Sequence, residues 1–170
     1  MAPLQLLDLG TGSGCLLAAL LCELPESTGI GIDIMPDALF VARRNLIRNG
    51  LGRRAQFLCG DWTQALRGKS FDVVIANPPY IPDSDAGGLA SEVIDHDPKI
   101  ALFGGSDGLA AYRTILPDLH RLVRSEGIIA FEIGTGQRSD VTSMLESAGF
   151  TNVECKHDLA GIERCLSALP

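Results

Sequence analysis

An asparagine, two prolines and a tyrosine follow the apolar run at residues 71–76, in the order Asn77-Pro78-Pro79-Tyr80. The prolines remove two backbone donors at the end of an expected strand, where α/β sheets usually bind their ligands. The Asn77 side-chain oxygen and the Pro78 carbonyl can each accept one hydrogen of a planar NH2 group, and Tyr80 can stack on that group. Because Pro78 and Pro79 stiffen the turn, these acceptors are preorganised for an attacking nitrogen. A merely structural proline turn is the alternative.

Three glycines lie between the first expected strand and the first expected helix, in the stretch DLGTGSG. Without a Cβ, Gly10, Gly12 and Gly14 let backbone amides approach a ligand closely. A dinucleotide fingerprint needs the spacing G-x-G-x-x-G, and Cys15 occupies the position of its third glycine. The spacing therefore disfavours hydride chemistry on NAD, and a glycine turn without a ligand remains the alternative.

Acidic residues stand at the ends of the next two expected strands. Asp33 ends the second strand, where a carboxylate can accept both ribose hydroxyls of a nucleoside. After the third strand, Asp61 can accept from the exocyclic amine of adenine, Trp62 can cover the ring, and Ile34 can line its other side. Taken singly, Asp33 has an alternative role as a helix cap, and Asp61 and Trp62 as a loop cap and core filler. Features at the ends of three successive strands together favour a nucleoside pocket.

The predicted nucleoside carries no phosphate. No Walker lysine accompanies the glycines, and Asp8 in front of them would repel a phosphate. S-adenosylmethionine fits, because carboxylates favour its sulfonium and Asp8 can hold its methionine amino group directly or through water. Methyl transfer to a nitrogen held at Asn77 needs no strong base, since the proton can leave to solvent after the methyl has moved.

These side chains require a sheet that brings several strand ends together. Short apolar runs alternate with segments of helical period, which is the pattern of βαβ units around a mostly parallel sheet. Strands are expected at residues 4–9, 28–34, 55–59, 71–76 and 127–133, and helices at residues 15–24, 36–50 and 137–149. A further helix is expected with Ser106 as its N-cap, kinked or split by Pro117 and continuing to about residue 127. Residues 152–159 and 163–169 predict a closing antiparallel hairpin around Gly161.

Length, charge and cysteine content narrow the class of protein. A chain of 170 residues suits a single domain at residues 1–170, and a net charge of −7 argues against direct binding of nucleic acid. Five cysteines without a C-x-x-C pair fit a reduced interior, and no apolar run reaches membrane-spanning length. A cytoplasmic protein without membrane contact is therefore expected. No metal is assigned, because His96, His120 and His157 lie in separate segments without ligand spacing.

Several motifs together resemble a known family. They are DLGTGSG, GIDI, GDW, NPPYIP and FEIG, with the segment at residues 92–112 and the terminal DLAGIERCLSAL. This set resembles the catalytic domain of the HemK-type protein-glutamine N5-methyltransferases, which modify the glutamine of the Gly-Gly-Gln motif in peptide chain release factors. NPPY alone is shared with N6-adenine methyltransferases of DNA and RNA, so residues 92–112 are the more specific part.

The resemblance implies a Rossmann-like class I fold, S-adenosyl-L-methionine as cofactor and a release factor as protein partner. Together with the residue arguments above, it predicts a set of cofactor contacts: Asp8, Gly10, Thr11, Gly12, Ser13, Gly14, Asp33, Ile34, Asp61, Trp62 and Asn77. It implies that the substrate glutamine is held by Asn77, Pro78, Pro79 and Tyr80. The catalytic residues predicted among these are Asn77, Pro78 and Tyr80.

The sequence departs from this family at its beginning. Family members carry a helical N-terminal domain before the glycine motif, whereas this sequence starts a few residues before the first expected strand. We expect that domain to be absent from residues 1–170, with weaker turnover of a protein substrate and a more open cofactor pocket. Two other functions remain open: an N6-adenine methyltransferase acting on DNA or RNA, and a cofactor-binding core without activity of its own.

Overall fold

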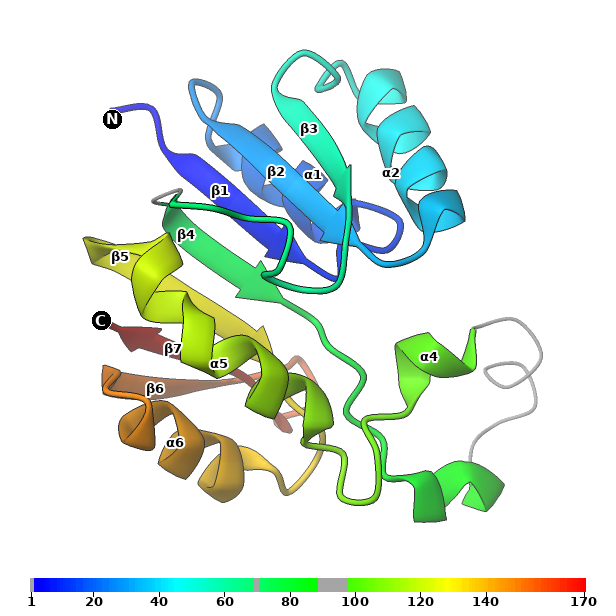
Figure 1. The fold of residues 1–170 in the computed structure, drawn as a ribbon, viewed down its shortest axis with the longest axis vertical. Coiled ribbons are helices and arrows are strands. Elements are labelled where there is room, and N and C mark those ends of the chain that lie inside the picture. The colour runs from blue at the N-terminus through cyan, green and yellow to red at the C-terminus, as the bar shows by residue number, and fades with distance from the viewer. Residues whose placement is uncertain (1, 69–70, 89–97) are drawn as a thin grey trace.

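A computed structural model describes residues 2–68, 71–88 and 98–170 of the chain (Figure 1). His96 and the first part of the segment at residues 92–112 lie outside the described residues. The strands are β1 (Gln5–Leu9), β2 (Thr28–Asp33), β3 (Ala55–Cys59), β4 (Phe71–Ala76), β5 (Val123–Glu132), β6 (Thr151–His157) and β7 (Glu163–Leu169). The helices are α1 (Cys15–Glu23), α2 (Pro36–Arg48), α4 (Lys99–Leu102), α5 (Ala110–Leu122) and α6 (Arg138–Ser147), with a 3-10 helix η1 (Asp83–Gly88).

The seven strands form one sheet in the order β3-β2-β1-β4-β5-β7-β6. Strands β1 to β5 pair in parallel, and β7 runs antiparallel between β5 and β6. The predicted parallel sheet with an antiparallel C-terminal hairpin is confirmed. The strand order reverses between β1 and β4, so the loops that leave these two strands open a crevice at one edge of the sheet.

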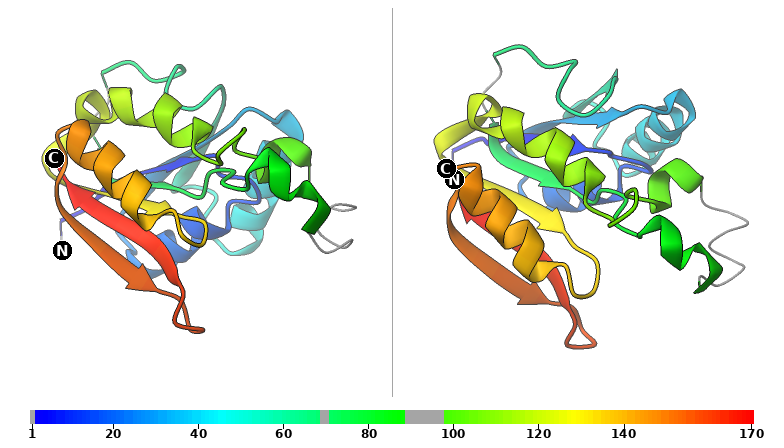
Figure 2. Two further views of the ribbon diagram at one scale, coloured as in Figure 1. Left: turned by 90° about the horizontal axis from the view of Figure 1, so that it is seen from below. Right: turned by 60° about the horizontal axis from the view of Figure 1, so that its bottom comes forward.

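Helices cover both faces of the sheet. Figures 1 and 2 show α5 and α6 on one face and α1 on the other. Side chains alternate between the faces along β1: Leu6 packs with Leu17 and Leu46 on the α1 side, whereas Leu7 and Leu9 join the larger core under α5 and α6. The two faces of the sheet are therefore covered, so a site is expected at an edge, and in open α/β sheets it lies at the carboxyl ends of the strands.

Helix α5 departs from the sequence expectation at its beginning and at its proline. It starts at Ala110 instead of near Ser106, because the Asp107 carboxylate accepts the Leu109 amide in a local turn before the helix. Pro117 lies inside the helix without dividing it. Pro117 is exposed, so the carbonyl one turn before it, which loses its partner, can bond to water.

The expected continuation of this helix to about residue 127 is wrong. The helix ends at Leu122 and β5 begins at the next residue. Val123 pairs with Phe71 of β4, and the register then shifts so that Val73 pairs with Ile128. Pairing on both sides of this shift, at Val123 and again from Ile128, keeps the intervening residues in the strand and outweighs their local helical pattern.

Candidate active site

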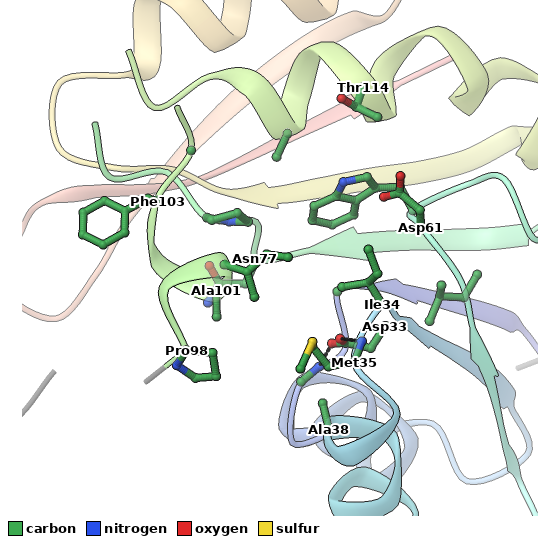
Figure 3. Close-up of a pocket in the computed structure, with 18 of the residues that line it drawn as sticks. Asp33, Ile34, Met35, Ala38, Asp61, Asn77, Pro98, Ala101, Phe103 and Thr114 are labelled. Carbon is green, nitrogen blue, oxygen red and sulfur yellow. Dashed lines mark hydrogen bonds between the residues drawn. The ribbon is translucent and has the colours of Figure 1, made fainter. Parts of the chain in front are cut away.

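A cavity of about 890 Å³ lies where the loops after β1, β2, β3 and β4 converge (Figure 3). All four strands are parallel, so their carboxyl ends meet at the same edge of the sheet. The volume is within the range of small-molecule sites. Predicted residues that line the cavity are Gly10, Gly12, Ser13, Asp33, Ile34, Asp61, Trp62, Asn77 and Pro79. The fold thus brings together residues spread over about 70 positions of the sequence.

Glycine is favoured at three positions of the loop after β1, for different structural reasons. All have positive φ, at 69° for Gly10, 53° for Gly12 and 77° for Gly14, which favours glycine. A Cβ at Gly10 would lie 3.0 Å from the Trp62 ring, and one at Gly14 would lie 2.8 Å from Leu46 Cδ1 of α2. At Gly12 the nearest atom would be 4.0 Å away, so this residue leaves open space beside the cavity. Gly10 and Gly14 therefore allow close packing against Trp62 and Leu46, and Gly12 leaves room for a ligand to approach the loop.

Asp33 connects the glycine loop to the start of α2. Its Oδ2 atom accepts the Gly12 amide and its Oδ1 atom accepts the Met35 amide, each at 2.9 Å (Figure 3). Met35 is the N-cap residue of α2, so the helix-cap alternative raised for Asp33 describes one of its two bonds. Each carboxylate oxygen has a second lone pair, which leaves capacity for a ligand hydroxyl.

Trp62 carries its indole on a backbone in the left-handed region, with φ at 45°. This conformation is uncommon outside glycine and persists where surrounding contacts impose it. The Thr63 hydroxyl donates to Asp118 Oδ2 at 2.7 Å, and Arg121 donates to the carbonyls of Leu66 at 2.9 Å and Thr63 at 3.3 Å. Arg121 also pairs with Asp118 at 2.9 Å. These contacts anchor the loop after β3 to α5, a role that no sequence pattern indicated.

Asp8 lies behind the glycine loop instead of on the cavity wall. It is 1% exposed, and its Oδ2 atom accepts the Thr11 hydroxyl at 2.6 Å. Its Oδ1 atom has no hydrogen-bond partner among the described residues. Burial raises the pKa of Asp8 to about 6, and the Thr11 hydrogen bond opposes that rise. Its predicted contact with the methionine amino group stays a prediction.

The segment Asn77-Pro78-Pro79-Tyr80 divides two cavities. Asn77 is exposed, and Figure 3 places it between Ala101 and Ile34 on the wall of the first cavity. Pro79 lines the same cavity, whereas Pro78 is buried. Tyr80 instead lines a second cavity of about 740 Å³. Asn77 and Tyr80 therefore face different cavities, although only three positions separate them in the sequence.

The Tyr80 hydroxyl has a defined partner. It donates to Glu132 Oε1 at 3.1 Å, at the end of β5. Burial raises the pKa of Tyr80 above its usual value, and the nearby Glu132 carboxylate raises it further. The phenol therefore stays protonated at neutral pH. Through this hydrogen bond, Glu132 holds the ring of Tyr80 in place.

Three glycines leave room for the segment at residues 77–80. A Cβ at Gly104 would lie 2.5 Å from the Pro79 carbonyl oxygen, and one at Gly108 would overlap the Tyr80 carbonyl oxygen. A Cβ at Gly134 would lie 3.0 Å from Cδ2 of the Tyr80 ring. Glycine is therefore required at positions 104 and 108 because the backbone there passes close to the backbone of Pro79 and Tyr80.

Residues 98–105 form a wall of the first cavity that the residue arguments did not anticipate. The Ile81 amide donates to the Leu102 carbonyl at 3.0 Å, and the Gly104 amide donates to the Ile81 carbonyl at 2.9 Å. This pairing places an apolar wall opposite α2, contributed by Pro98, Ile100, Ala101 and Phe103. In the sequence, this segment stood out only through the family resemblance, as the part specific to the substrate. Its place in the wall of the cavity was not predicted.

The charges around the first cavity suit a ligand that carries a positive charge and no phosphate group. Asp33, Asp37 and Asp61 line it, and in the described parts of the chain no lysine or arginine does. A pyrophosphate would meet carboxylates without a compensating cation, whereas a sulfonium would be attracted. S-adenosylmethionine therefore matches both the volume and the charge of this cavity.

Comparison with known proteins decides the family. The family model described as "Methyltransferase domain" matches residues 2–152. The chain belongs to this methyltransferase family. Its fold also matches the crystal structure of a ribosomal protein L11 methylase from Lactobacillus delbrueckii, with a TM-score of 0.70 and 19% identity over 99% of this chain and 69% of that one. The predicted Rossmann-like methyltransferase class is confirmed.

Two relatives of this methyltransferase domain have more specific names. The release factor glutamine methyltransferase of Rhodospirillum rubrum is 49% identical over 164 residues, which are 96% of this chain and 50% of the relative. That of Caulobacter vibrioides is 46% identical over 160 residues, or 94% and 55%. The chain spans about half the length of these curated relatives.

In the described parts of the methyltransferase domain, no helix has the length and hydropathy needed to cross a membrane.

Proposed function

We propose that this methyltransferase domain transfers a methyl group from S-adenosylmethionine to the side-chain amide nitrogen of a glutamine, in the Gly-Gly-Gln motif of a peptide chain release factor. The observation that carries the proposal is that Asn77 lines the first, acidic cavity while Tyr80, three residues later, lines the second cavity. The identities of 49% and 46% to enzymes with that name favour glutamine over adenine.

The cofactor is expected to bind along the first cavity. Asp33 has lone pairs for the ribose hydroxyls, beside the open space at Gly12. Asp61 can accept from the adenine amine, and Trp62 can cover the ring. When bound, S-adenosylmethionine supplies the reactive methyl and a neutral thioether as the leaving group. The carboxylates of this wall contribute the charge that favours its cationic form.

The acceptor nitrogen is expected to be held at residues 77–80. The Asn77 side-chain oxygen and the Pro78 carbonyl accept its two hydrogens, and the Tyr80 ring supports the flat carboxamide. An amide nitrogen is a weak nucleophile, so acceptors that favour its developing positive charge lower the barrier. A nitrogen–carbon bond forms, the carbon–sulfur bond breaks and one proton leaves to solvent, so no side chain is required as a strong base.

The protein partner and the location follow from the same proposal. A release factor works at the ribosome, so methylation in the cytoplasm is proposed. The net charge of −7 suits a protein partner better than bare nucleic acid, whose affinity depends on basic contacts.

Methyl transfer from labelled S-adenosylmethionine tests the proposal. The chain is incubated with a release factor, with the same factor carrying Gln→Ala in its Gly-Gly-Gln motif, and with an adenine-containing oligonucleotide. Label on the first protein alone is the expected result. Label on the oligonucleotide alone would favour the adenine alternative, and cofactor binding without transfer to any of the three would favour a core without its own activity.

A further inference from the structure

Gln137 is a buried side chain that joins three separate segments beside Tyr80. It is 8% exposed and stands at the N-terminal end of α6. Its Nε2 atom donates to the Tyr80 carbonyl at 2.9 Å and, more weakly, to the Gly108 carbonyl at 3.4 Å. Its Oε1 atom accepts the Gly134 amide at 2.9 Å. One carboxamide thus links the loop after β4, the loop before α5 and the loop after β5.

The surrounding backbone is shaped to admit this carboxamide. A Cβ at Gly108 would lie 2.6 Å from Nε2, and a Cβ at Gly134 would lie 2.9 Å from Oε1. Either contact would push Gln137 away from its partners. Two glycines therefore stand where this side chain must reach the Tyr80 carbonyl, which indicates that the local packing depends on it.

A role in capping α6 does not account for the side chain. Gln137 is the N-cap residue of that helix, yet its side chain makes no capping hydrogen bond. Both ends of the carboxamide are directed to the loops instead. Removing these hydrogen bonds should therefore disturb the loops around Tyr80 more than the helix.

We propose that Gln137 is a positioning residue for methyl transfer. By fixing the Tyr80 carbonyl against Gly108 and Gly134, it sets the orientation of residues 77–80 relative to the cofactor cavity. It acts through the backbone of Tyr80, and Asn77 remains the residue expected to contact the reacting nitrogen. This inference rests on the proposed function, because its effect on rate is measured in that reaction.

The first test replaces the carboxamide with a side chain of similar length that cannot donate a hydrogen bond and is only a weak acceptor. Gln137→Met is compared with Gln56→Met, which changes an exposed glutamine in β3. In single-turnover reactions with saturating S-adenosylmethionine, Gln137→Met should lower the transfer rate constant by about 10- to 100-fold, since a misplaced reacting group costs this much. The cofactor Kd should change less than about twofold, because Gln137 lies outside the first cavity. Gln56→Met should match the wild type.

A charge-reversible variant separates positioning from bulk packing. In Gln137→Glu, an oxygen replaces Nε2, and its ionised form faces the carbonyls of Tyr80 and Gly108. The protonated form can donate again to Tyr80. The transfer rate of this variant, relative to wild type, should therefore rise as the pH is lowered from 8 to 6. A flat ratio would contradict the proposed hydrogen bond to Tyr80.

Amide hydrogen exchange tests the same inference without using activity. Gln137→Met should speed exchange at Gly134 and in residues 77–83 and 104–109, while exchange in α2 and β3 stays as in the wild type. Should the wild type transfer no methyl to a release factor, the proposed function fails, and this local exchange pattern still decides the positioning role. Unchanged exchange, or a uniform rise together with a parallel fall in rate, cofactor affinity and Tm, would overturn the inference.

Discussion

Asp33 Oδ2 accepts the Gly12 amide at 2.9 Å, and this bond, beside the one from the Thr11 amide to the Ile32 carbonyl at 2.8 Å, ties the end of β2 to the glycine loop after β1. Asp33→Asn would place an NH2 group against the amide of either Gly12 or Met35, so one of the two bonds is lost. We expect the Kd of S-adenosylmethionine to rise about 10- to 100-fold, as a lost hydrogen bond to a charged group costs about 1.5–3 kcal/mol. Calorimetric titration measures this, with the exposed Asp140→Asn as control; an unchanged Kd would contradict the assignment.

Replacing Asn77 should separate chemistry from cofactor binding. Asn77→Ala removes the acceptor proposed for the substrate nitrogen and leaves the walls formed by Asp33 and Trp62 intact. The single-turnover rate should fall about 10²- to 10³-fold, which is the usual effect of losing one preorganised polar contact. The Kd of S-adenosylmethionine should move less than threefold or so. A larger effect on Kd than on rate would assign Asn77 to the cofactor instead.

Gly108 and Gly50 provide a matched pair for testing the close approach to Tyr80. Both have positive φ, at 75° and 74°, but a Cβ at Gly50 meets no atom within 4 Å. Gly50→Ala should therefore cost only the left-handed backbone penalty of about 1–2 kcal/mol. Gly108→Ala adds overlap with the Tyr80 carbonyl and Gln137, so its free energy of unfolding in urea should fall further, by about 1–3 kcal/mol more. Equal losses would refute the steric explanation.

Asp8 should make stability depend on pH. Its pKa is raised by burial to about 6, so protonation favours the folded state. That stabilisation is complete below about pH 4 and is lost as the pH rises through 6. Asp8→Asn removes the ionisation, so its free energy of unfolding minus that of the wild type should increase by about 2–3 kcal/mol between pH 4 and pH 7. Urea unfolding at several pH values measures the difference; a constant difference would show that Asp8 does not titrate in this range.

Arg121 should affect cofactor binding without touching the cofactor. Arg121→Lys cannot reach the carbonyls of Thr63 and Leu66 together with Asp118, so the loop bearing Trp62 loses part of its anchor. We expect the Kd of S-adenosylmethionine to rise about three- to tenfold, equivalent to about 1 kcal/mol. Arg124→Lys is the control, because Arg124 pairs with Asp72 near the start of β4, away from the cavity. Similar Kd values for both variants would remove the anchoring role.

Much of the fold was predictable because local patterns and tertiary structure agree. Alternating apolar runs and helical periods located β1 to β4 within one residue at each end, and Gly161 correctly marked the turn between β6 and β7. The local pattern and the tertiary structure disagree after Pro117, because β5 includes residues whose sequence pattern is helical. Sequence neighbours do not report that Val123 can pair with Phe71, because that contact joins positions 52 residues apart.

The candidate active site was also predictable from the sequence only in part. The order of residue types alone placed acceptor groups after β1, β2, β3 and β4, since parallel strands end at one edge of a sheet. Which side of residues 77–80 each group faces required the structure: Asn77 lines the first cavity and Tyr80 the second.

By itself, the sequence determined the class of chemistry, through glycine spacing, acidic strand ends and the Asn-Pro-Pro-Tyr turn, because these are local properties of backbone and side chain. Only the tertiary structure decided how the turn is held. Gln137 lies 57 residues from Tyr80 and Arg121 lies 58 from Thr63, and neither has a local pattern that marks it. Their importance arises from burial and hydrogen bonding between loops, which exist only once the sheet has assembled.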